Sequence, residues 1–150
     1  MLLGMRPLIS AMNNAAAMKE LLRLGARADI LCGQESFLVK YCRDAYTDAD
    51  VLRLLLQNGA CVNAPDARRR TPLMHSIDNQ ASSEVIQVLI EEGADVFAVD
   101  AAGKSVFDRC QERGKWEPCL KEYAWVMAVW PALLSLASDG IHSLVILRCR

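Results

Sequence analysis

The chain repeats one pattern of apolar and polar positions three times. In each copy two adjacent aliphatic residues are followed, three residues later, by a Gly-Ala pair. The aliphatic pairs are Leu21-Leu22, Leu55-Leu56 and Leu89-Ile90, and the Gly-Ala pairs are Gly25-Ala26, Gly59-Ala60 and Gly93-Ala94. Successive copies lie 34 residues apart, and a fixed period of this length is typical of stacked repeats. Stacked repeats present extended surfaces, so the pattern favours binding over chemistry.

Residues 66–99 show the repeated unit most clearly. A polar turn opens the unit, after which Thr71 can cap a helix and Pro72 fits the first helical position. The apolar positions then predict two short helices, the second of which ends at Gly93. One unit has too little apolar surface to form a core alone, so we expect the units to stack.

This unit resembles the ankyrin repeat. The matching residues are Asp66, Thr71, Pro72, Leu73 and Ser76, followed by Leu89-Ile90 and Gly93-Ala94-Asp95-Val96. The next unit carries Asp100, Gly103, Ser105, Val106, Phe107 and Cys110 in the same positions, and the resemblance covers residues 5–115.

Three features depart from that family's pattern. Met74 occupies the position of the family's histidine and His75 comes one place later, so the hydrogen bonds of that histidine are expected to be missing or replaced. Arg69 stands where the family prefers a glycine with positive φ, which predicts a strained or differently shaped turn. The period is one residue longer than the family's, and the link 79–83 between the helices can hold the extra residue.

The predicted fold is all-α, an ankyrin-repeat solenoid of stacked helix-turn-helix units with β-turn hairpin loops. The predicted helix pairs are 5–12 with 16–24, 37–44 with 50–57, 71–78 with 84–92, 105–113 with 117–129, and 131–138 with 141–148. Residues 1–130 form the repeat domain, and residues 131–150 form a degenerate terminal repeat or an apolar capping tail. The predicted core includes Leu55, Leu56, Leu73, Leu89 and Ile90.

Composition and cysteine spacing narrow the class of protein. Of the 150 residues 53% are hydrophobic and the net charge is −1, which excludes a disordered chain and a polybasic nucleic-acid binder. The six cysteines lack the spacing of a zinc site, so neither a metal nor a cofactor is expected. Cys42, Ser76 and Cys110 share one position of the repeat, which predicts a small buried side chain there. We expect reduced thiols in a cytoplasmic or nuclear protein.

The apolar tail leaves two interpretations open. Residues 123–147 contain a single charged residue, Asp139, and can form either a further degenerate repeat or a membrane anchor. The unbroken apolar run 123–138 has 16 residues, fewer than the roughly 18 to 20 that a spanning helix needs, which favours the repeat. Apolar residues lie near both ends of the chain, among them Leu2, Leu3, Leu144 and Ile146. A piece of a longer array and self-association through these ends are therefore further expectations.

The resemblance implies a binding groove along the turn tips and the ends of the first helices. Position by position, it implicates the following residues of the two best-matched units: Ala67, Arg68, Arg70, Asp78, Asn79, Ala101, Ala102, Lys104, Glu112 and Arg113. The preceding unit adds Gly33, Gln34, Ser36, Asp44 and Ala45.

These residues predict a non-enzymatic scaffold that binds a partner protein. Arg68, Arg70 and Lys104 would form a strip of cations that prefers an acidic segment. Interspersed acids such as Asp78 argue against a nucleic acid. His75 with Asp78 lacks a nucleophile, so catalysis is not expected. The alternative function is a membrane-tethered adaptor anchored by residues 123–147.

Overall fold

The computed structural model describes residues 5–43, 46–114 and 120–121, and this part of the chain is mostly helical. Its helices are α1 (Met5–Ser10), α2 (Ala15–Arg23), α3 (Phe37–Arg43), α4 (Ala49–Gln57), α5 (Pro72–Asp78), α6 (Ser83–Glu91) and α7 (Val106–Arg113). A small antiparallel hairpin of β1 (Leu31–Cys32) and β2 (Glu35–Ser36) precedes α3.

Short polar side chains define where the helices begin. Thr71 and Ser82 each accept a hydrogen bond from the amide three residues later, so they cap α5 and α6. Ser105 forms a capping box with Asp108 at the start of α7, in which each side chain satisfies the other's backbone N–H. Because these helices have only seven to nine residues, the free amides at each N-terminus are a large share of the helix's backbone donors, and each capping side chain satisfies one of them.

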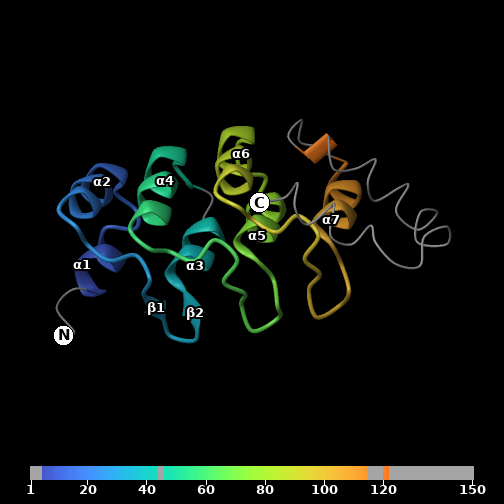
Figure 1. Ribbon diagram of the computed structural model, residues 1–150, viewed down its shortest axis with the longest axis horizontal. Coiled ribbons are helices and arrows are strands. Elements are labelled where there is room, and N and C mark those ends of the chain that lie inside the picture. The colour runs from blue at the N-terminus through green and yellow to red at the C-terminus, as the bar shows by residue number, and fades with distance from the viewer. Residues whose placement is uncertain (1–4, 44–45, 115–119, 122–150) are drawn as a thin grey trace, which may run out of the picture.

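The helices lie in two rows, as Figure 1 shows. The first helices of the units, α1, α3, α5 and α7, form one row, and α2, α4 and α6 form the other. Within the rows α3 packs on α5, α5 on α7, α2 on α4 and α4 on α6. The loops before α3, α5 and α7 project together from the side opposite to α2, α4 and α6 (Figure 1). This stack of helix-turn-helix units is the arrangement that the sequence predicts.

The core runs between the two rows. Leu55, Leu73 and Leu89 are fully buried, as predicted. Leu56 and Ile90 were expected in the core but are only half-buried, because they lie at its edge. The shared small position is confirmed, since the side chains of Cys42, Ser76 and Cys110 are inaccessible to solvent. Burial raises the pKa of the Cys42 thiol to about 12 although the Ser76 hydroxyl lowers it, so this thiol stays protonated.

The predicted helices agree with the observed ones within two residues at each end, for all seven that can be compared. The predicted helices 117–129, 131–138 and 141–148, the terminal domain 131–150 and the tail 123–147 lie outside the described residues, as do Asp44 and Ala45. In the described part of the chain, no helix is both long and apolar enough to cross a membrane.

Candidate functional site: the turn loops

Three loops form the candidate surface: residues 31–36, 64–71 and 98–105, here called the turn loops. In the second and third loops one aspartate organises the backbone. Oδ1 of Asp66 accepts hydrogen bonds from the amides of Arg68 and Arg70, both at 2.8 Å. Asp100 repeats this geometry with the amides of Ala102 at 2.8 Å and Lys104 at 3.0 Å. The two loops therefore have matching backbones, and their tips are held in fixed positions.

The second carboxylate oxygen of Asp66 fastens its loop to α5. Oδ2 accepts hydrogen bonds from Nε of Arg70 at 2.9 Å and from the His75 ring at 3.0 Å. Burial of Asp66 would raise its pKa, but the Arg70 amide, His75 and the Arg68 amide bring that pKa below its usual value. Burial also lowers the pKa of His75, and Asp66 only partly offsets this effect. A neutral His75 that donates its Nε2 proton to an ionised Asp66 satisfies both groups.

In the last turn loop, an arginine takes the place of His75 as the side chain that holds the aspartate. Arg109, on α7, donates through one guanidinium nitrogen to Asp100 of its own loop and through another to Asp78 of α5. Burial of Asp100 raises its pKa, but the loop amides and Arg109 outweigh this effect and lower the pKa overall. Arg109 occupies the same position of the repeat as His75, 34 residues later. It therefore joins two units as well as closing a turn.

Arg69 adopts the left-handed backbone that the turn requires. Its φ is 60°, and the equivalent Gly103 has a φ of 75°. The loop thus keeps its shape despite the missing glycine, and a residue with a Cβ carries the conformational cost. Of the two expected outcomes, a strained or a differently shaped turn, the structure shows the strained one.

A comparison with known families agrees with this repeated arrangement. Residues 5–100 match the family model of ankyrin repeats, in three copies. The chain belongs to the ankyrin repeat family. Ankyrin repeats are generally protein–protein interaction modules and are typically non-enzymatic. None of the curated proteins matches the chain significantly.

Most of the predicted surface charges prove to be paired, either within one ankyrin unit or between neighbouring units. Arg70 contacts Asp66 at 2.9 Å, Lys104 contacts Glu112, and Arg113 approaches Asp78 at 3.8 Å. The expected strip of cations formed by Arg68, Arg70 and Lys104 therefore carries less uncompensated charge than its three basic residues suggest. Two of its three members are neutralised, because a carboxylate of the same unit lies within reach of each.

Two arginines at the tip of the middle turn loop stand apart from these pairs. Arg68 and Arg69 are exposed, and none of the described carboxylates forms an ion pair with either side chain. Arg69 was absent from the predicted site. The sequence could have indicated Arg69, because a residue two positions before Thr71-Pro72 lies at the tip of the turn in either of the expected turn shapes.

Other predicted residues serve contacts between ankyrin units. Asn79 donates its side-chain amide to the carbonyls of Cys42 and Arg43 on α3. The Ala101 amide donates to the Arg68 carbonyl at 2.9 Å and links two turn loops. Ala67, Ala102, Gly33 and Gln34 are exposed at the tips, Ser36 caps α3, and Asp78 and Glu112 belong to the ion pairs above.

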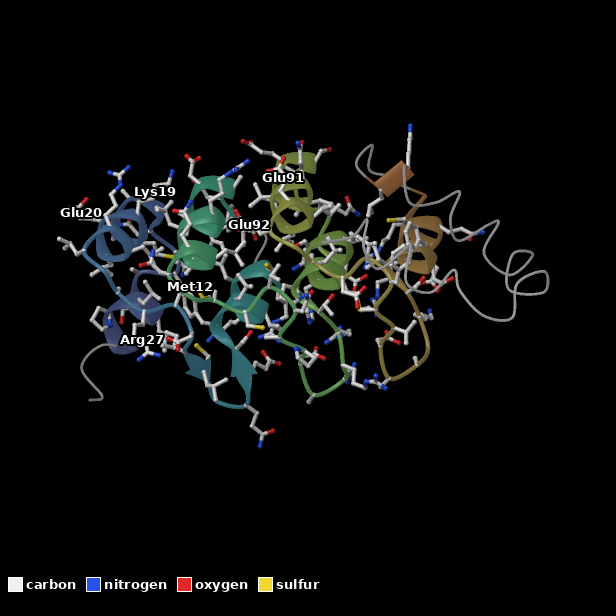
Figure 2. The ribbon with its side chains drawn as sticks, in the orientation of Figure 1. Met12, Lys19, Glu20, Arg27, Glu91 and Glu92 are labelled. Atoms are coloured by element: carbon white, nitrogen blue, oxygen red, sulfur yellow. The ribbon has the colours of Figure 1, made fainter. Side chains whose placement is uncertain are left out.

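Charges on the opposite side of the stack pair between the second helices. Lys19 of α2 contacts Asp50 of α4 at 3.0 Å, and Arg53 of α4 contacts Glu91 of α6 at 3.3 Å. The row formed by α2, α4 and α6 is here called the outer row, and Figure 2 shows Lys19 and Glu91 on it, away from the turn loops. The described residues include no group of three or more His, Cys, Asp or Glu side chains that could hold a metal ion.

Proposed function

We propose that the chain is a non-enzymatic scaffold that binds a partner protein on the turn loops and the adjoining first helices. The observation that supports this most directly is the exposure of Arg68 and Arg69 on a loop whose other charges are paired. Two exposed guanidinium groups on a fixed backbone favour a partner that supplies carboxylates, which arginine can hold through two hydrogen bonds.

The fixed backbone of the loop adds to this argument. Because the Asp66 carboxylate already holds the amides of Arg68 and Arg70, little backbone order has to be gained when a partner binds. The alanines at the tips, Ala67 and Ala102, add no bulk that would keep a partner away from the backbone. The surface therefore combines a defined shape with free charge.

Affinity capture tests this proposal. The full chain and the variant Arg68→Glu/Arg69→Glu are immobilised, and the proteins that each retains are compared. Arg70 is left unchanged, because a glutamate there would face Asp66 and weaken the loop itself. We expect the double variant to fold and to lose at least roughly tenfold of the specifically retained protein, since each lost charge-assisted hydrogen bond contributes about 1.5 kcal/mol or more.

Arg23→Glu provides the matched control. Arg23 is exposed on α2, in the outer row, and it forms no ion pair with the described carboxylates. A protein retained by the wild type and by Arg23→Glu but lost from the double variant supports the proposal. Equal retention by all three chains would refute the assignment of the turn loops and direct attention to residues 123–147.

A further inference from the structure

The turn loops expose an apolar side chain at one repeated position. Leu31, Pro65 and Val99 follow one another at intervals of 34 residues. Leu31 is 62% exposed, Val99 is 43% exposed, and Pro65 is exposed as well. Most other large apolar side chains of the described residues are buried, so this recurrence needs an explanation.

The three side chains point outward for the same structural reason. In extended backbone, successive side chains point to opposite faces. The residues that follow them are Cys32, Asp66 and Asp100, which are half-buried or buried against the helices. Leu31, Pro65 and Val99 therefore face away from the helices, one on each of three loops that lie side by side in Figure 1. We call this set the apolar stripe.

The charge beside the apolar stripe has one sign. Every described carboxylate on the turn loops has a cationic or histidine partner: Glu35 pairs with Arg43, Asp66 with Arg70 and His75, and Asp100 with Arg109. The cations left without such a partner on the loops are Arg68 and Arg69. A partner that covers the apolar stripe thus meets two uncompensated positive charges and no free negative charge on these loops.

We propose that the apolar stripe and Arg68-Arg69 together bind an extended acidic segment of the partner protein, with an apolar side chain at every third residue. The spacing follows from the stack. Packed helices lie about 8–10 Å apart. A segment in the extended polyproline II conformation advances about 3.1 Å per residue and has three residues per turn, so that every third side chain lies on the same face. Three residues of the segment therefore span one unit, and its carboxylates meet the arginines. This inference rests on the proposed function and adds to it the conformation and the sequence pattern of the partner segment that binds.

Selection from a library of random 12-residue peptides, displayed against the full chain, tests the proposal. We expect the enriched peptides to be acidic, with apolar residues at positions i, i+3 and i+6. A labelled synthetic copy of an enriched peptide should bind Leu31→Ser/Val99→Ser at least tenfold more weakly than the wild type. Leu24→Ser is the matched control, because Leu24 is 77% exposed at the end of α2 and should not affect binding. Unchanged melting midpoints establish that each variant folds.

The proposal would be overturned if no peptides were enriched, or if the enriched peptides lacked the three-residue spacing. Equal binding of the peptide to Leu31→Ser/Val99→Ser and to the wild type would also overturn it. So would a dimer that the wild type forms and this variant does not, because the apolar stripe would then bind a second copy of the chain. Binding that is lost in Arg68→Glu/Arg69→Glu but kept in Leu31→Ser/Val99→Ser would refute the stripe and leave the proposed function standing. Binding that neither variant changes would refute both.

Discussion

At the scale of single residues, Asp66 and Asp100 determine the shape of the turn loops. One oxygen of each carboxylate holds two loop amides, and the other oxygen reaches a side chain on the following helix. The two partners on the helices, His75 and Arg109, differ chemically although they occupy the same position of the repeat. The middle loop is therefore sensitive to protonation of a histidine, whereas the last loop is held by a permanent charge.

The backbone of Arg69 gives the first prediction. Replacing a left-handed arginine with glycine should relieve about 1–2 kcal/mol of strain and cost about 0.5–1 kcal/mol in chain entropy. We therefore expect Arg69→Gly to stabilise the fold by about 0.5–1 kcal/mol, measured by urea unfolding. Gly103→Ala is the reciprocal control and should destabilise it by about 1 kcal/mol, because a Cβ there meets no atom within 4 Å and the backbone alone is strained. Destabilisation by Arg69→Gly would contradict the assigned turn.

Protonation of His75 gives the second prediction. Because burial lowers the pKa of His75 in the folded chain, the unfolded chain binds more protons once the pH falls below about 6.5. The contribution of neutral His75 to stability is thus complete above that pH and is lost as the pH falls. Arg70 and Arg43 reinforce this sign, and Asp66 opposes it.

Urea unfolding between pH 7.5 and 5 measures the effect. We expect the wild type to lose more free energy of unfolding over this range than His75→Gln, which keeps an amide donor near Asp66 but has no titrating group. Asp66 remains in both chains and titrates at lower pH, so it does not confuse the comparison. A wild type that gains stability relative to the variant on acidification would show that His75 is charged in the folded chain.

At the scale of helices, each unit depends on its neighbours. Leu89 on α6 has no exposed surface, so Leu89→Ala should lower the free energy of unfolding by about 2–5 kcal/mol through lost burial and a cavity. Ile90 on the same helix is half-buried, and Ile90→Ala should have a smaller effect. Hydrogen exchange should locate the damage in α6 and in the adjacent α4 and α5, since these helices pack on it. An unchanged melting midpoint for Leu89→Ala would contradict this packing.

The sequence predicts the helices more completely than the polar contacts. The Gly-Ala repeats and apolar pairs place every compared helix end within two residues, because they depend on local preferences and on one short period. The hydrogen bonds of the Asn79 side chain could not be predicted in this way, since their acceptors lie 36 and 37 residues away on α3. Likewise the pairing of Arg70 with Asp66 depends on how the turn folds back, so the sequence alone did not indicate that a carboxylate neutralises this charge.

At the scale of the whole molecule, the two sides of the stack differ in how their charged side chains are paired. On the outer row, Lys19 and Arg53 pair with acids of the next unit and reinforce the stack. On the opposite side, the turn loops combine fixed backbones, small tip residues and two arginines without a described carboxylate partner. This asymmetry is the physical basis for assigning the binding surface to the turn loops.

Site-specific photo-cross-linking tests that assignment most directly. A photoreactive residue is introduced at Ala67, at the exposed tip of the middle loop, or at Gln87, on the exposed side of α6. Both chains are used to capture the partner, and covalent adducts are identified by mass spectrometry. The account predicts adducts of one partner protein at position 67 and none at position 87. Adducts of that partner at position 87 alone would place the binding surface on the outer row and contradict the account.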